Sequence, residues 1–179
     1  IIPDTKALIN HPITDEGILF SYNKPNEFST KDIKVKMGNM VLYDDLQFVY
    51  NKKPKPNNSF YSDIHQVHNS KTPVHNGYEL SIRPDSTLQH LKNKAVIVNS
   101  SGASQGGIVD GDLIKTTVRS LGDFSIKVDT IAPTIVPINI LEGKNMKALS
   151  RISLRIRDNL SGIKNFNGYI DGNWILMEF

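Results

Sequence analysis

The segment 102–106, Gly-Ala-Ser-Gln-Gly, is the sharpest catalytic pattern in this sequence. It matches G-x-S-x-G, the turn that presents the nucleophile of many serine hydrolases, and it follows the apolar run 95–98. That turn requires a helix directly after the serine, whereas the residues after Gly107 read as a turn and a strand. The histidine of such hydrolases also follows the serine, and every histidine here precedes Ser104. We therefore interpret 102–106 as a loop between two strands.

A second pattern is a group of histidines that zinc could use. The five histidines are His11, His65, His68, His75 and His90. On a strand, positions 65 and 68 point to opposite faces, and the loop 69–73 leaves the direction of His75 open. Apart from the nearby Asp63, no carboxylate has a spacing that would complete a zinc site. We interpret these histidines as structural.

Carboxylates gather near a proline-containing junction at 129–133. They are Asp129, Asp158 and Asp171, and an oxygen-rich junction of this kind can hold calcium, which takes about six to eight oxygen ligands. The segment 158–162, Asp-Asn-Leu-Ser-Gly, also has the side-chain acceptors and the glycine that a tight loop needs. We therefore interpret 158–162 as a turn and not as part of a calcium site.

Aromatic rings that can stack on sugars are Tyr43, Tyr50, Phe60, Tyr61, Tyr169 and Trp174. Trp174 lies in the run 173–179, where both faces of a strand would be apolar. This pattern predicts that Trp174 is buried between layers.

Composition excludes several classes of protein. A net charge of +3 over 179 residues is too small to indicate a nucleic-acid partner, and the basic cluster 52–56 is interpreted as a solvated loop. The absence of cysteine excludes disulfides and thiolate metal sites. No stretch approaches the roughly 18 apolar residues of a membrane span. Since the chain opens without a methionine or an apolar leader, we expect a fragment of a longer or processed protein.

Alternation with a period of two predicts an all-β protein. Candidate strands are 17–22, 31–37, 46–50, 78–83, 94–99, 112–118, 124–129, 151–157, 163–170 and 173–179. The last two are joined by Asp171-Gly172, a dipeptide that favours a two-residue hairpin turn. Only 86–94 has a weak helical pattern, two turns at most.

These strands predict tandem antiparallel β-sandwich, immunoglobulin-like modules. We expect a first module over residues 1–128, including an N-terminal extension, a linker at 129–133 and a partial second module at 134–179. About four strands in the second module are too few for a complete sandwich, so it would expose an apolar edge.

Three segments carry a resemblance to a known family: 121–133, 156–163 and 168–174. They resemble the C-terminal region of exported lysostaphin-type zinc metallopeptidases of Bacteroidetes, where β-sandwich modules follow the peptidase domain. Segments 41–45 and 72–75 are more loosely similar. The family binds zinc through H-x-x-x-D and H-x-H motifs. Here His11 to Asp15 matches the first by spacing alone, and no H-x-H occurs.

The resemblance implies that this chain is the non-catalytic accessory region of an exported cell-wall (peptidoglycan) metallopeptidase. It would position or anchor the peptidase domain, at the periplasm or cell surface. We expect no catalytic, metal or cofactor residues in this segment, and no nucleic-acid partner or membrane span. The expected partners are the upstream peptidase domain, the cell wall or another protein, and a second copy through 163–179. Two alternatives stay open: a carbohydrate- or wall-binding module, and a stand-alone hydrolase that uses Ser104 or the histidines.

Overall fold

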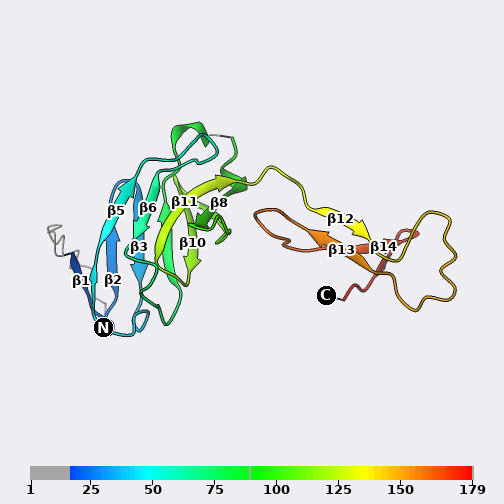
Figure 1. Cartoon of the computed structure of the whole chain (residues 1–179), viewed down its shortest axis with the longest axis horizontal. Coiled ribbons are helices and arrows are strands. Elements are labelled where there is room, and N and C mark those ends of the chain that lie inside the picture. The colour runs from blue at the N-terminus through cyan, green and yellow to red at the C-terminus, as the bar shows by residue number, and fades with distance from the viewer. Residues whose placement is uncertain (1–16, 89, 179) are drawn as a thin grey trace. The chain divides into compact units, whose positions relative to one another are not determined.

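The chain consists of two all-β units. A computed structural model of the protein describes residues 17–88 and 90–178. The first unit is Ile1–Val128 and the second is Asp129–Phe179. In the described residues the regular elements are antiparallel strands and two short 3-10 helices, so the predicted all-β class is confirmed (Figure 1).

The first unit is a β-sandwich. Its strands are β1 (Ile18–Phe20), β2 (Asn26–Ser29), β3 (Ile33–Met37), β4 (Leu46–Phe48), β5 (Tyr50–Lys53), β6 (Ile64–Val67), β7 (Tyr78–Ile82), β8 (Ala95–Asn99), β9 (Ile108–Asp110), β10 (Leu113–Val118) and β11 (Gly122–Val128). One sheet has the order β2-β3-β7-β10-β9 and the other has the order β5-β6-β11-β8. Strands β1 and β4 form a two-stranded ribbon. The 3-10 helices are η1 (Ser86–Leu88) and η2 (Lys92–Lys94), where the sequence predicts two helical turns at most.

Alternation along the strands explains which face of each sheet is buried. On β3 the residues at 33, 35 and 37 are at most 1% exposed, whereas the two lysines between them are not buried. Phe124 and Ile126 on β11 contribute to the same core from the other sheet. Burying a side chain of this size contributes about 1.5–3 kcal/mol. This shared core therefore holds the two sheets together.

Aromatic rings connect the β1-β4 ribbon to this core. The rings of Phe20 and Phe48 stack with centroids 4.3 Å apart and an interplanar angle of 2°. Phe28 on β2 lies 5.4 Å from Phe48 and 4.9 Å from Tyr50 on β5. Each such pair adds about 0.5–1.5 kcal/mol beyond its buried area. The ribbon is thus fixed by a ring contact to β2 of the first sheet, and Phe28 in turn contacts β5 of the other sheet.

The second unit contains two short ribbons. Its strands are β12 (Thr134–Pro137), β13 (Leu154–Arg157), β14 (Gly168–Ile170) and β15 (Asn173–Ile175). Strand β12 pairs with β13 and β14 pairs with β15. Both Asp171 and Gly172 have positive φ, 47° and 80°, so the predicted two-residue hairpin is confirmed.

The second unit differs from the predicted sandwich in its packing. None of its described residues, 129–178, is buried. The predicted burial of Trp174 between layers is wrong, since its side chain is 59% exposed. The described strands of this unit form two separate two-stranded ribbons in place of two larger sheets. The immunoglobulin-like detail therefore stays a prediction.

Four strands of the first unit, β2, β5, β6 and β9, were not expected from the sequence. The interpretation of 52–56 as a solvated loop is wrong for Lys52 and Lys53, which lie on β5. Strand β5 is an edge strand, and its burial pattern shows no buried residue. Such a strand lacks a clear alternation of apolar and polar residues, which is the pattern that predicts a strand. Lysines on an edge strand hinder pairing with another chain.

Candidate functional site

Ser104 lies in a hairpin arm. After the turn at 99–102, residues 103–106 run back along β8, and the amide of Ile97 donates to the carbonyl of Gly106 at 2.9 Å. The Ser104 Oγ accepts a hydrogen bond from the amide of Gly106 at 3.1 Å. Strand β9 follows, so the predicted loop between two strands is confirmed. This hydroxyl has a structural partner within its own turn.

His65 and His68 have separate surroundings. His65 is buried, 1% exposed, on β6. His68 Nδ1 accepts a hydrogen bond from the amide of Val49 at 3.4 Å. In the described residues, no three His, Asp or Glu side chains lie close enough together to hold a metal ion.

The two other described histidines lie away from this pair. The ring of His75 meets the edge of the Tyr43 ring at 5.2 Å, and His90 is exposed in the turn before η2. His11 and Asp15, which match the H-x-x-x-D spacing, lie outside the described residues.

Tyr50 and His65 form a pair of titratable groups whose pKa values are both shifted. Tyr50 Oη lies 2.8 Å from His65 Nδ1. Burial lowers the pKa of His65 to about 4, although the carboxylates of Asp32 and Asp63 act in the opposite direction. Burial, followed by the same two carboxylates, raises the pKa of Tyr50 to about 12. At neutral pH the phenol is therefore protonated and the imidazole neutral, which suits a phenol that donates to Nδ1.

Lysines on and after β5 form ion pairs with carboxylates from other strands and loops. Lys52 Nζ lies 3.0 Å from Asp32 and 3.5 Å from Asp63. The pKa of Lys52 is raised, first by its hydrogen bond to Asp32. Lys55 pairs with Asp85. Since these groups are partly exposed, each pair contributes at most about 1 kcal/mol, and the basic cluster is largely neutralised.

The carboxylates at the start of the second unit organise a turn. Asp158 Oδ2 accepts hydrogen bonds from the amides of Leu160 and Gly162, at 3.0 and 2.8 Å. Asp129 Oδ2 accepts from the amide of Ser161 at 2.8 Å, and a hydrogen bond from the Ser161 side chain is the first cause that lowers the pKa of Asp129. The predicted turn chemistry at 158–162 is confirmed. Asp171, by contrast, lies in the β14-β15 hairpin turn.

Two exposed aromatic residues lie opposite each other on the second ribbon. Tyr169 and Trp174 are directly paired in the β14-β15 register and are 63% and 59% exposed. Paired residues on adjacent strands project from the same face. The ribbon thus displays two aromatic rings together.

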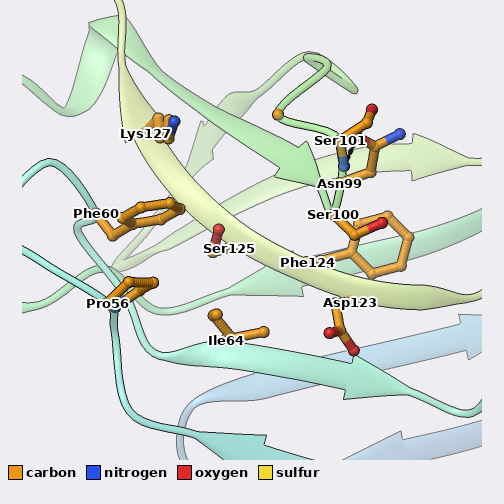
Figure 2. A pocket seen from close by; sticks show the side chains of 11 residues that line it. Pro56, Phe60, Ile64, Asn99, Ser100, Ser101, Asp123, Phe124, Ser125 and Lys127 are labelled. Carbon is orange, nitrogen blue, oxygen red and sulfur yellow. Dashed lines mark hydrogen bonds between the residues drawn. The ribbon is translucent and has the colours of Figure 1, made fainter.

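A pocket lies on the outer face of the β5-β6-β11-β8 sheet, and sequence reasoning missed it. Its volume is about 340 Å³. Figure 2 shows its lining side chains, which come from the loop after β5, the start of β6, β11 and the turn at 99–102. The sequence pattern that could have indicated this pocket is the alternation along β11, which puts Asp123, Ser125 and Lys127 on one face. That face alone did not indicate which loops would enclose it.

The Zu5-like domain family matches the chain over residues 18–129. No curated protein matches the chain. No helix in the described part of the chain is long and apolar enough to cross a membrane.

Proposed function

The chain belongs to the Zu5-like domain family, and on this premise we propose that it is a non-catalytic accessory region of an exported cell-wall peptidase. Its role is to position or anchor the peptidase domain at the periplasm or cell surface. The resemblance of 121–133, 156–163 and 168–174 to the region that follows lysostaphin-type peptidase domains supports the peptidase as partner.

The observation that carries the proposal is the uncovered apolar surface of the second unit. Ile135, Leu141 and Leu176 are 62%, 73% and 73% exposed, and Trp174 is 59% exposed. Several large apolar side chains that are exposed on one small unit mark a surface that contacts a protein or another large partner. In the first unit, Ser104 and His65 make hydrogen bonds that support the fold, which favours a binding role over a catalytic one.

The test compares the parent peptidase with a version that lacks residues 17–179. We expect hydrolysis of insoluble peptidoglycan to fall at least tenfold, because anchoring raises the local concentration of enzyme at the wall. Hydrolysis of a soluble cross-link peptide should be unchanged, since the reacting groups lie upstream. Equal losses on both substrates, or no loss on either, would contradict the positioning role.

A wall-binding module is the second candidate, and the exposed pair of Tyr169 and Trp174 favours it. Adjacent aromatic rings provide apolar faces on which sugar rings can stack. This candidate predicts that the isolated chain sediments with insoluble peptidoglycan. Trp174→Ala should abolish sedimentation, while Tyr43→Ala, which removes a single exposed ring from the first unit, should not.

A further inference from the structure

We propose that the pocket on the outer face of β11 binds both ends of a short zwitterionic peptide, with the peptide carboxylate at Lys127 and its amino group at Asp123. This site goes beyond the accessory role and does not depend on it. Three features support it: the charged and polar groups that line the pocket, its apolar wall and the hydrogen bonds that hold its loops.

The positive group is held in place by an aromatic ring. Lys127 Nζ lies 4.6 Å from the centroid of the Phe60 ring, which is a cation–π contact. Among the described residues, Lys127 has no ion-pair partner. An ammonium fixed by a ring and not neutralised by a carboxylate is suited to bind an anionic group from outside.

A hydroxyl lies beside this ammonium on the floor of the pocket. Ser125 is two residues before Lys127 on the same face of β11 and is only 4% exposed. Within the described part of the chain its hydroxyl has no hydrogen-bond partner, although it lines the pocket (Figure 2). A carboxylate bound here can accept a hydrogen bond from this hydroxyl and a charge-assisted one from the ammonium.

The negative group lies at the other end of the same face. Asp123 lines the pocket and pairs with the half-exposed Lys53 at 3.4 Å, a long and solvated contact. Residues four apart on a strand are separated by about 13 Å, close to the length of three or four extended residues. A ligand amino group can thus reach Asp123 when the ligand carboxylate is at Lys127.

The remaining wall is apolar, and its loops are fixed. Pro56, Phe60 and Ile64 line one side. The loop that carries Pro56 and Phe60 is tied to β11, because the amide of Tyr61 donates to the carbonyl of Ile126 at 2.9 Å and Ser62 Oγ accepts from the amide of Ile126 at 2.9 Å. Ile64 is the first residue of β6.

The opposite turn is fixed by the Asn99 side chain. Asn99 Oδ1 accepts hydrogen bonds from the amides of Ser101 and Ala103 at 3.1 and 3.0 Å. Because these walls are already ordered, less conformational entropy is lost when a ligand binds. The volume, about 340 Å³, lies at the lower end of the range for small-ligand sites.

The test is an NMR titration of the isotope-labelled full chain with the tripeptide Ala-Leu-Ala, and with its C-amidated and N-acetylated forms. We expect amide shifts at Phe60, Ser101 and Ser125. Amidation should weaken binding about tenfold or more, because it removes the charge that Lys127 binds. Acetylation should weaken binding several-fold through Asp123.

Variants identify the groups responsible. Lys127→Met keeps the stem against Phe60 but should weaken binding of the free tripeptide about tenfold and make it insensitive to amidation. Asp123→Asn should remove the sensitivity to acetylation. The control is Lys36→Met, an exposed lysine on the other sheet, which should leave binding unchanged. Equal binding of all three peptides, shifts away from the pocket, or no shifts at millimolar peptide would overturn the proposal.

Discussion

The contact between Tyr50 and His65 shows how burial changes the chemistry of a single residue. The sequence presents His65 as one of several histidines at a spacing that zinc could use. In the sandwich it becomes a neutral buried base with a phenol 2.8 Å away, near Asp32, Asp63 and the ammonium of Lys52. A neutral imidazole that already has a partner supports the fold. His68 follows the end of β6 and has a positive φ of 54°, so the alternation of a strand does not decide its direction.

Acid should destabilise the first unit through His65. The pKa of a solvated histidine is 6.5 and that of His65 in the folded protein is about 4, so between these values the unfolded chain binds a proton that the folded protein does not. The stabilisation is complete above pH 6.5 and is lost as the pH falls towards 4. The whole shift corresponds to about 3 kcal/mol of unfolding free energy. Urea denaturation at a series of pH values measures this loss.

The variant His65→Gln provides the comparison, because an amide can still bond to the phenol but does not titrate. Between pH 6.5 and 4, the free energy of unfolding should fall less steeply with falling pH in this variant. Part of the slope should remain, because burial also lowers the pKa of His68. Identical slopes in both proteins would show that His65 is protonated in the folded state.

Gly107 is the point at which the chain passes from one sheet to the other. Residues 103–106 run along β8 of one sheet, and β9, which starts at Ile108, belongs to the other. A Cβ at Gly107 would lie 2.4 Å from the carbonyl oxygen of Ala95 and 3.0 Å from Val96 Cα. Only glycine lets the two backbones approach this closely.

Replacement of Gly107 by alanine should therefore destabilise the sandwich. Displacing backbone atoms from such a contact costs about 1–3 kcal/mol, as in overpacked cores. Thermal and urea unfolding of Gly107→Ala should both show this loss.

Gly38→Ala is the matched control. No heavy atom lies within 4 Å of a Cβ built there, and its φ is not in the positive range. That change should be neutral or slightly stabilising, because it restricts the unfolded chain. Equal stability of the two variants would contradict the close approach at Gly107.

At the scale of the whole molecule, the two units differ in how they are held together. The first has a core shared by two sheets, with Leu80, Ile97 and Ile126 completely buried. The second has two ribbons and, in its described part, no buried residue. Strand pairing alone gives little stability to a two-stranded ribbon. The second unit is therefore the part of the chain that gains most from a partner.

Self-association is the expected result when no other partner covers this surface. Light scattering of the isolated chain at rising concentration should give a mass that approaches twice the monomer mass of 20.0 kDa. Trp174→Ser should return the mass to that of a monomer, since it removes the largest exposed apolar side chain of the β14-β15 ribbon. Tyr43→Ser, on the first unit, is the control and should not. A monomer at every concentration would count against a dimer through 163–179.

The sequence by itself determined the all-β class, the buried face of strands such as β3 and β11, the Asp171-Gly172 hairpin and the turn at 158–162. These features depend on local chemistry: alternation with a period of two, positive φ at Asp-Gly, and side chains that bond to nearby amides. Only the tertiary structure decided the pairing order of the strands, the place of β5 at a sheet edge, the exposure of Trp174 and the pocket around Ser125. A period of two shows which face of a strand is apolar, but not which strand lies beside it or which loop covers its outer face.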